Sequence, residues 1–322
     1  MRYRLLGNSE LKVSTIGLGT WVLGGDHWGS IDDRESIATI QKAIDCGINL
    51  VDTAPAYGYG HSEELIGKAI KGHRNQMVIA TKCGVHRKGM TEFFFILKPH
   101  MIRKELEDSL KRMGIEVIDL YQCHWPDPNI PIEDTMEEML KMQSEGKIRY
   151  IGVSNFDTDL LERALKVASI VSVQPQYSLL ERSIEKDVLP FCKEHNIGVM
   201  AYGSLGSGIL SGKYKELPRF HKDDARSFFY PYYKEPYWSR TQELIKEMQQ
   251  IADQHGKPVA HVAINWVCQQ PGVTTALVGA RNPEQVEINA AAGMWELSDE
   301  ELNRIEEALN RIFNPSHLSS HI

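Results

Sequence analysis

The sequence predicts an α/β protein, a (β/α)8 TIM barrel, on three observations. Eight short β-rich runs recur along the 322 residues, and helical patterns separate them. The runs are mostly continuously apolar, which is typical of strands buried on both faces of a parallel sheet. The length lies within the range of one such barrel, so we expect a single domain over residues 1–322.

The expected strands lie at fairly regular intervals along the chain. They are 14–19, 48–53, 77–82, 117–124, 148–154, 170–175, 197–202 and 274–279. Amphipathic helices are expected between them: Asp32 and Glu35, for example, have capping-box spacing ahead of a helical pattern. Pro99 and Pro131 each stand where a first helical turn is expected, a position that tolerates the missing N–H.

An open, doubly wound sheet is the competing fold, and the glycines argue against it. Such a sheet carries G-x-G-x-x-G directly after its first strand. Here the first strand leads into GLGTWV, which lacks the third glycine, and GSLGSG at 203–208 follows the seventh strand. The sequence therefore disfavours a Rossmann-type turn for any bound dinucleotide.

Two further segments accompany the expected barrel. Residues 2–13 are expected to form a hairpin around a Gly-Asn-Ser turn, suited to plug the bottom of the barrel. Residues 205–238 are expected to form a long loop after the seventh strand, and structureless loops of this length are usually functional. The tail 314–322 is short, which argues against a specificity loop there.

Composition and charge exclude several classes of protein. The formal net charge is −7 with both signs spread along the chain, so neither a nucleic-acid partner nor a membrane surface is indicated. No run has signal-peptide or membrane-spanning length. The five cysteines form no C-x-x-C, so no disulfide framework and no metal site are expected. We expect a cytoplasmic protein, a monomer or weak homo-oligomer, that acts on a small molecule.

Polar side chains stand where the apolar strands end. In a barrel of this class the catalytic groups lie at the carboxyl ends of the strands. The candidates, in chain order, are Asp52 with Tyr57 on the following loop, Lys82, His124, Ser154 with Asn155, Gln174 and Gln176, and Tyr202. The sequence therefore predicts a polar cluster above an apolar core.

Taken singly, these residues have ordinary explanations. Asp52 suits a turn cap, Lys82 a solvated side chain, His124 a rim histidine and Tyr57 simple packing. The cluster favours a chemical role, because four such groups at three strand ends would meet in space.

Together these four groups suit the reduction of a carbonyl compound. A free phenol has a pKa of about 10, and a nearby Lys82 ammonium is expected to lower it. Asp52 would hold the buried lysine charged, and His124 would orient the carbonyl oxygen. Tyr57 is thus predicted as a general acid. No side chain donates hydride, so a nicotinamide or flavin is implied.

Seven blocks of the sequence resemble the aldo-keto reductase superfamily, most closely its bacterial general-stress and inositol-operon-type members. The blocks, in order, are DTAPAYGYGHSEELIGKAI, IATK, IDLYQCHWPD, KIRYIGVSNF, VQPQY, AYGSLGSGILSGKY and LVGARNPEQVEIN. The resemblance runs from about residue 3 to residue 310. It implies a barrel reductase of aldehydes and ketones that uses NADPH (NADP).

The resemblance also implies roles for individual residues. Asp52, Tyr57, Lys82 and His124 match the catalytic tetrad, with Tyr57 as proton donor. The positions that match the cofactor site are Ser154, Asn155 and Gln176 at the carboxamide, Tyr202 stacked on the nicotinamide, Ser204, Leu205, Gly206 and Lys213 at the pyrophosphate, and Gly279, Ala280, Arg281, Gln285 and Asn289 at the adenosine half.

The adenosine segment departs from the eukaryotic members of the superfamily. Those carry Lys and Ser where Gly279 and Ala280 align, Arg where Gln285 aligns and Glu where Ile288 aligns. Arg281 is a planar cation suited to replace the lost charge at the 2′-phosphate. Alternatively, Arg281 is a solvent-facing residue at the start of a helix, so the sequence leaves open how strongly the protein prefers NADPH to NADH.

The substrate pocket is expected to be aromatic. Trp21 and Trp125 match positions that line the pocket in the superfamily. Five more aromatic residues on the same loops are candidates to join them, or else pack within their loops: Trp28, Phe94, Phe95, Phe229 and Tyr230. An aromatic pocket with one polar focus favours an apolar or aromatic carbonyl compound.

Two other functions compete with the reductase. One is a cofactor-binding regulatory subunit with little turnover, because some relatives of this kind serve as partners of membrane channels and retain the tetrad. The other is isomerase or aldolase chemistry on Lys82, which leaves Ser154, Asn155, Gln176 and Tyr202 without a role.

Overall fold

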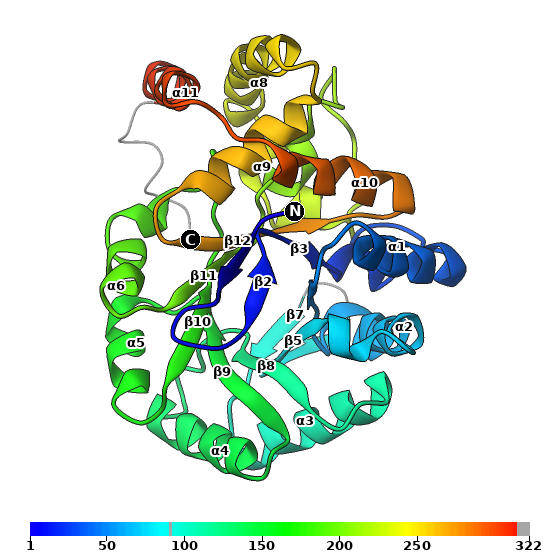
Figure 1. Ribbon diagram of the computed structural model, residues 1–322, viewed down its shortest axis with the longest axis vertical. Coiled ribbons are helices and arrows are strands. Elements are labelled where there is room, and N and C mark those ends of the chain that lie inside the picture. The colour runs from blue at the N-terminus through cyan, green and yellow to red at the C-terminus, as the bar shows by residue number, and fades with distance from the viewer. Residues whose placement is uncertain (90–91, 314–322) are drawn as a thin grey trace.

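The computed structural model, which describes residues 1–89 and 92–313, closes eight parallel strands into a barrel ringed by helices (Figure 1). The strands are β3 (Ile16–Gly19), β4 (Leu50–Asp52), β5 (Val78–Cys83), β8 (Ile118–Cys123), β9 (Ile148–Ser154), β10 (Ile170–Gln174), β11 (Gly198–Ala201) and β12 (Val273–Gly279). Each pairs with the next along the chain, and β12 closes on β3. The predicted fold class and the eight predicted strands are confirmed.

Helices follow the strands and cover the outside of the barrel (Figure 1). They are α1 (Asp33–Asp45), α2 (His61–Ala69), α3 (Pro99–Met113), α4 (Ile132–Ser144), α5 (Thr158–Leu165), α6 (Val188–Glu194), α7 (Ala225–Phe228), α8 (Tyr237–Gln254), α9 (Val259–Gln269), α10 (Pro283–Ala291) and α11 (Asp299–Ile312). The Asp32 side chain accepts a hydrogen bond from the Glu35 N–H, as its spacing predicts. Pro99 opens α3, but Pro131 is the residue before α4 rather than its first residue.

The N-terminal hairpin closes the bottom of the barrel, as predicted. Strands β1 (Tyr3–Leu5) and β2 (Lys12–Ser14) pair antiparallel. Leu6, Leu11 and Val13 are buried against apolar side chains of the barrel strands, among them Leu50. The turn needs glycine at residue 7, because its φ is +56° and a Cβ there would lie 2.3 Å from the Val171 carbonyl oxygen. The hairpin thus seals one end and leaves the other for chemistry.

Two segments of the opposite end differ from the sequence prediction. A second hairpin, β6 (Val85–Lys88) and β7 (Glu92–Phe95), follows β5 and was not predicted. The segment 205–238 is not structureless: it contains α7 and short 3-10 turns at Gly206–Ser211 and Pro231–Tyr233. Aromatic rings packed on one another, such as Phe220 on Tyr233 at 4.8 Å, join this segment to the main hydrophobic core.

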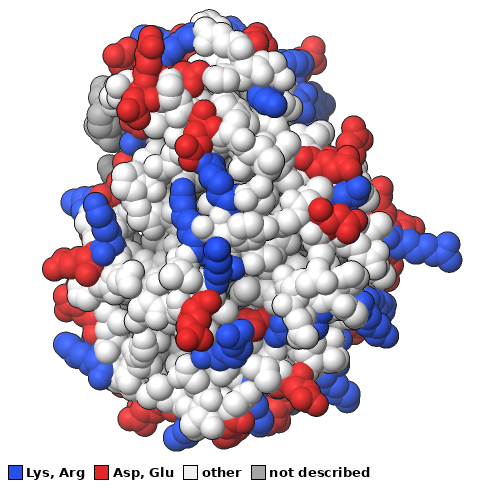
Figure 2. Space-filling view, viewed as in Figure 1, with Lys and Arg blue, Asp and Glu red and all other residues white. Residues whose placement is uncertain are grey.

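The surface carries mixed charge. Figure 2 shows acidic and basic side chains interspersed over the face that bears the N-terminal hairpin. In residues 1–89 and 92–313 we find no helix with the length and apolar character needed to cross a membrane. The predicted tail 314–322 lies outside the described residues.

Candidate active site

A cavity of about 630 Å³ opens at the carboxyl ends of the barrel strands. Its floor includes the last residues of several strands, among them Gly19 of β3, Asp52 of β4, Ser154 of β9, Gln174 of β10 and Gly279 of β12. The position agrees with the rule that barrel enzymes build their sites at this end.

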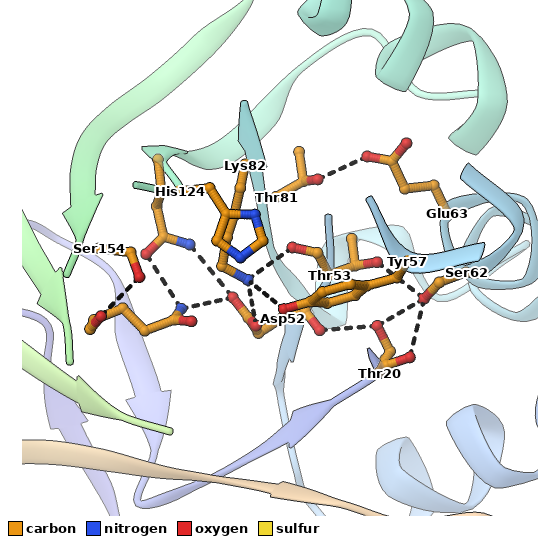
Figure 3. Close-up of polar contacts among 12 residues, drawn as sticks. Thr20, Asp52, Thr53, Tyr57, Ser62, Glu63, Thr81, Lys82, His124 and Ser154 are labelled. Atoms are coloured by element: carbon orange, nitrogen blue, oxygen red, sulfur yellow. Dashed lines mark hydrogen bonds and ion pairs between the residues drawn. The ribbon is translucent and has the colours of Figure 1, made fainter. Parts of the chain in front are cut away.

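Four side chains meet at the bottom of this cavity (Figure 3). Lys82 Nζ donates to Asp52 Oδ2 at 2.6 Å, to the Thr53 carbonyl at 2.9 Å and to the Tyr57 hydroxyl at 3.3 Å. The His124 ring lies edge-on to the Tyr57 ring, with centroids 5.9 Å apart. The structure therefore brings together Asp52, Tyr57, Lys82 and His124, although Lys82 itself lies beneath the cavity wall.

Asp52 is the counter-ion of Lys82, whose side chain is fully buried. Burial lowers the pKa of Lys82, and the charge of Asp52 and its hydrogen bond act against that lowering. The second oxygen of Asp52, Oδ1, accepts from Gln174 Nε2 at 2.8 Å and from Gln122 Nε2 at 3.3 Å. Both carboxylate oxygens are thus occupied, which fixes Oδ2 toward the ammonium group.

The expected acidification of Tyr57 is not what the structure gives. Burial raises the pKa of Tyr57 well above its usual value, and the negative charge of Asp52 raises it further. Lys82 does not outweigh these two effects. The phenol therefore keeps its proton at neutral pH. Burial also lowers the pKa of His124 well below its usual value, with Lys82 adding to the effect, so its imidazole is neutral.

The loop that carries Tyr57 has an unusual backbone. Gly58, Tyr59 and Gly60 have φ of +64°, +55° and +93°, all in the left-handed region. A Cβ on Gly58 would lie 1.9 Å from the Gly24 carbonyl oxygen, so only glycine fits. These glycines hold the turn between β4 and α2 and direct Tyr57 toward Lys82.

Amide and hydroxyl groups gather beside the four residues. Asn155, whose φ is +60°, donates from Nδ2 to the His124 carbonyl at 3.0 Å and accepts at Oδ1 from the Tyr202 hydroxyl at 3.0 Å. Ser154, Asn155 and Tyr202 line the cavity. Gln176 does not: its Nε2 donates to the Tyr232 hydroxyl, and Gln174 lines the cavity instead.

The loop after β11 forms one wall of the cavity. Ser204, Leu205 and Lys213 line it, whereas Gly206 packs against Leu180 and Ile209 outside the lining. The run from residue 206 to 208 has positive φ throughout, including Ser207 at +59°, whose buried hydroxyl has no hydrogen-bond partner among the residues that the structure describes. Successive left-handed residues turn backbone N–H groups to one side, an arrangement suited to an anion.

The far end of the cavity carries a second cation. Gly279, Arg281, Gln285 and Asn289 line it, while Ala280 is buried behind them. Arg281 Nη2 donates to the Ser30 carbonyl at 2.7 Å, and its backbone N–H donates to Gln285 Oε1 at 2.9 Å. Lys213 and Arg281 both line the cavity, and neither forms an ion pair with a carboxylate among the described residues.

Aromatic rings enclose the opposite side. Trp21 stacks on Tyr57 with centroids 5.9 Å apart, and Trp125 stacks on Phe95 at 5.5 Å. The predicted residues Trp21, Trp125, Trp28, Phe95, Phe229 and Tyr230 line the cavity. Phe94 lies outside the lining and is 41% exposed.

Sequence reasoning missed several residues of the site. Gln122 had a signal, because a strand alternates and residue 122 shares the inward face with His124 two residues later. His27, Arg87 and Phe93 also line the cavity. Two of them lie on the hairpin β6–β7, whose existence the sequence did not reveal. No group of three His, Cys, Asp or Glu side chains suited to a metal ion was found among the described residues.

Known proteins resemble this chain over nearly its whole length. The model of the aldo/keto reductase family matches residues 15–310. Aldo-keto reductase YhdN of Bacillus subtilis is 42% identical over 319 residues, covering 98% of this chain and 96% of that protein. The NADH-specific methylglyoxal reductase of Escherichia coli is 35% identical over 324 residues, covering 95% of this chain and 98% of that protein.

Solved structures agree with these matches. The glycerol dehydrogenase AKR11B4 from Gluconobacter oxydans superposes with a TM-score of 0.90 at 40% identity, covering 99% of this chain and 98% of that one. An aldo/keto reductase from Klebsiella pneumoniae, solved in complex with NADP and acetate, gives a TM-score of 0.74 at 30% identity, covering 98% of this chain and 96% of that one.

Proposed function

The chain belongs to the aldo/keto reductase family and is an NAD(P)H-dependent oxidoreductase that acts on carbonyl compounds; from that premise we propose that it reduces aldehydes and ketones with NADPH, and that Tyr57 is the proton donor. The observation that carries the proposal is the hydrogen bond of 3.3 Å between buried Lys82 Nζ and the Tyr57 hydroxyl. This hydrogen bond places the Tyr57 hydroxyl, the proton donor of the proposal, next to the buried Lys82 side chain.

The residues around the cavity fit a dinucleotide. Ser154, Asn155 and Gln174 offer amide and hydroxyl groups suited to a carboxamide, and Tyr202 offers a ring for stacking. The left-handed run at 206–208 and Lys213 suit a pyrophosphate, and so does the Ser207 hydroxyl, which has no hydrogen-bond partner within residues 1–89 and 92–313. When bound, a reduced nicotinamide supplies the hydride that the protein lacks.

The protein's own part in the reaction is to bind, orient and protonate. Tyr57 would donate its hydroxyl proton to the carbonyl oxygen as negative charge develops there. A raised pKa suits this role, because Tyr57 stays protonated until a stronger base, the nascent alkoxide, takes the proton. Lys82 would stabilise the resulting phenolate, and the neutral His124 would orient the carbonyl group.

NADPH is proposed over NADH because of Arg281. A guanidinium group binds phosphate with two parallel hydrogen bonds, and its contact in the structure is with a neutral carbonyl that a phosphate can replace. The relative from Escherichia coli is described as NADH-specific and the one from Klebsiella pneumoniae was solved with NADP, so both cofactors are to be compared directly.

The test is turnover of a panel of carbonyl compounds by purified protein, with NADPH and NADH in parallel, against Tyr57→Phe. The expected result is consumption of NADPH with wild type, loss of turnover in the variant and unchanged cofactor binding. Full reduction by Tyr57→Phe would overturn the role of Tyr57. Tight retention of cofactor with negligible turnover of every compound would instead indicate the regulatory subunit.

A further inference from the structure

A second buried ion pair lies at the substrate side of the cavity, apart from Asp52 and Lys82. Arg87 Nη2 lies 2.5 Å from Asp26 Oδ2, and the two side chains are 2% and 11% exposed. Arg87 comes from β6 and lines the cavity, whereas Asp26 comes from the loop between β3 and α1. Charges this deeply buried are costly to hold unless they are paired, so the pair has to be made for these segments to pack.

Asp26 also holds the backbone next to Tyr57. The oxygen that faces Arg87, Oδ2, accepts a hydrogen bond of 3.2 Å from the Gly58 N–H. Gly58 is the first of the three left-handed residues of the catalytic loop and directly follows Tyr57. The carboxylate therefore connects Arg87 to the peptide group that sets the direction of the tyrosine.

Arg87 also contacts the loop that carries Tyr57 through the ring of Tyr59. Its guanidinium carbon lies 4.1 Å from the centre of the Tyr59 ring, a cation–π contact. The Tyr59 hydroxyl donates to the Gly89 carbonyl at 3.1 Å, and Gly89 directly follows β6. The β6–β7 hairpin and the loop that carries Tyr57 are thus joined by two contacts of Tyr59, one through its ring and one through its hydroxyl.

The contacts continue from Arg87 to the loop on the far side of the cavity. Arg87 Nη1 lies 2.7 Å from His27 Nε2, and a guanidinium group can only donate, so Nε2 accepts. His27 then carries its proton on Nδ1, which donates to the Asp223 carbonyl at 3.3 Å. The His27 carbonyl accepts from the Ala225 N–H at 2.8 Å. One chain of polar contacts therefore runs from the segment after β11, over the aromatic wall, to the peptide next to Tyr57.

We propose that Arg87, acting through Asp26, is a positioning residue for Tyr57 that fixes the catalytic loop and the substrate end of the cavity as one unit. The inference rests on the proposed role of Tyr57 as proton donor. We do not infer that Arg87 binds anionic substrates, because Asp26 neutralises its charge. A displacement of about 1 Å at a reacting group can lower a rate by about a hundredfold, so a loosened loop has a large effect without any lost contact to substrate.

The test compares variants that remove the connection with one that removes an unrelated ion pair. Arg87→Met and Asp26→Asn break it singly, and the double variant removes both charges, so that no buried charge is left unpaired. Arg87→Lys keeps the charge but not the planar group. Arg103→Met, which breaks a contact between α3 and Glu138 of α4, is the control.

The expected result is a fall of about 10- to 100-fold in kcat in the double variant, with cofactor affinity unchanged and partial recovery in Arg87→Lys. Because the two residues act as a unit, the double variant is expected to be no slower than Arg87→Met. A folded double variant with the kcat of wild type would overturn the inference.

A second readout does not depend on turnover. In protein labelled with ring-¹³C tyrosine, the resonance of Tyr57 is identified by its loss in Tyr57→Phe. It is expected to shift or broaden in Arg87→Met and in the double variant, but not in Arg103→Met. An unmoved resonance would overturn the inference even if wild type proved inactive, whereas an inactive wild type with a shifted resonance would overturn only the proposed function.

Discussion

Asp52 and Lys82 form an ion pair of 2.6 Å at the centre of the barrel, with side chains 4% and 0% exposed. The ion pair also sets the direction of the lysine side chain. Lys82 contacts the Tyr57 hydroxyl only because its other two hydrogen bonds, to Asp52 and to the Thr53 carbonyl, aim the ammonium group at the cavity.

Lys82→Met is expected to destabilise the protein strongly. It leaves the Asp52 carboxylate buried without its counter-ion, which typically costs about 3–5 kcal/mol. The double variant Asp52→Asn/Lys82→Met removes both charges and is expected to recover most of that loss, while both variants lose carbonyl reduction. Urea denaturation measures the stabilities. A double variant less stable than Lys82→Met would contradict this account of the pair.

The pH dependence of reduction is expected to follow Lys82 rather than Tyr57. The pKa of Tyr57 is raised, so the phenol stays protonated across neutral and mildly alkaline pH. The pKa of Lys82 is lowered from 10.5, so its charge is lost below that value as the pH rises. The kcat is therefore expected to be flat near neutrality and to fall on the alkaline side.

The same shift fixes how stability depends on pH. Between the lowered pKa of Lys82 and 10.5 the unfolded chain binds a proton that the folded chain does not, so this group makes stability rise with pH in that window. The rise is expected to be absent in Asp52→Asn/Lys82→Met. Denaturation midpoints across the alkaline range check it, and an equal rise in the double variant would assign it to another group.

Gln122→Leu is expected to loosen the orientation of Asp52 and so to change the ionisation of Lys82. Gln122 is fully buried and donates to Asp52 Oδ1, and removing one partner of a buried hydrogen bond costs about 1–3 kcal/mol. With Asp52 less firmly oriented, Lys82 loses its proton more readily, so the alkaline limb of kcat moves to lower pH. Gln143→Leu on α4, whose exposed Nε2 donates to the Arg149 carbonyl, is the control and is expected to leave the limb in place.

The strands could be predicted from the sequence, and so could the meeting of Asp52, Lys82 and His124, because both follow from where the apolar runs end; Tyr57, on the loop after β4, has no periodicity to place it. An apolar run that ends in Asp52, Lys82 or His124 puts that residue at the open end of any parallel barrel. It was harder to predict which glutamine after the sixth barrel strand lines the cavity. Two residues that are two positions apart in a strand point to the same face, as Gln174 and Gln176 would if the strand continued. Because β10 ends at Gln174, before Pro175, this rule does not apply to Gln176.

Other features depend on contacts that no local pattern carries. Arg87 and Phe93 lie on a hairpin of short strands whose sequences, VHRK and EFFF, lack a clear alternation. The raised pKa of Tyr57 depends on how deeply three-dimensional packing buries it. The pairing of Asp26 with Arg87 joins a loop residue to a strand residue 61 positions further along the chain, which a single sequence does not reveal.

Arg281→Ala is expected to separate the two nicotinamide cofactors. If Arg281 binds the 2′-phosphate, its loss removes charge-assisted hydrogen bonds of about 1.5–3 kcal/mol, roughly 10- to 150-fold in affinity for NADPH, with little change for NADH. Tryptophan fluorescence titration with each cofactor measures both affinities. Arg281 also donates to the Ser30 carbonyl, which lies in the same loop as Asp26 and His27. An equal loss for both cofactors would therefore mean that Arg281 acts by holding this loop, and it would count against a phosphate contact.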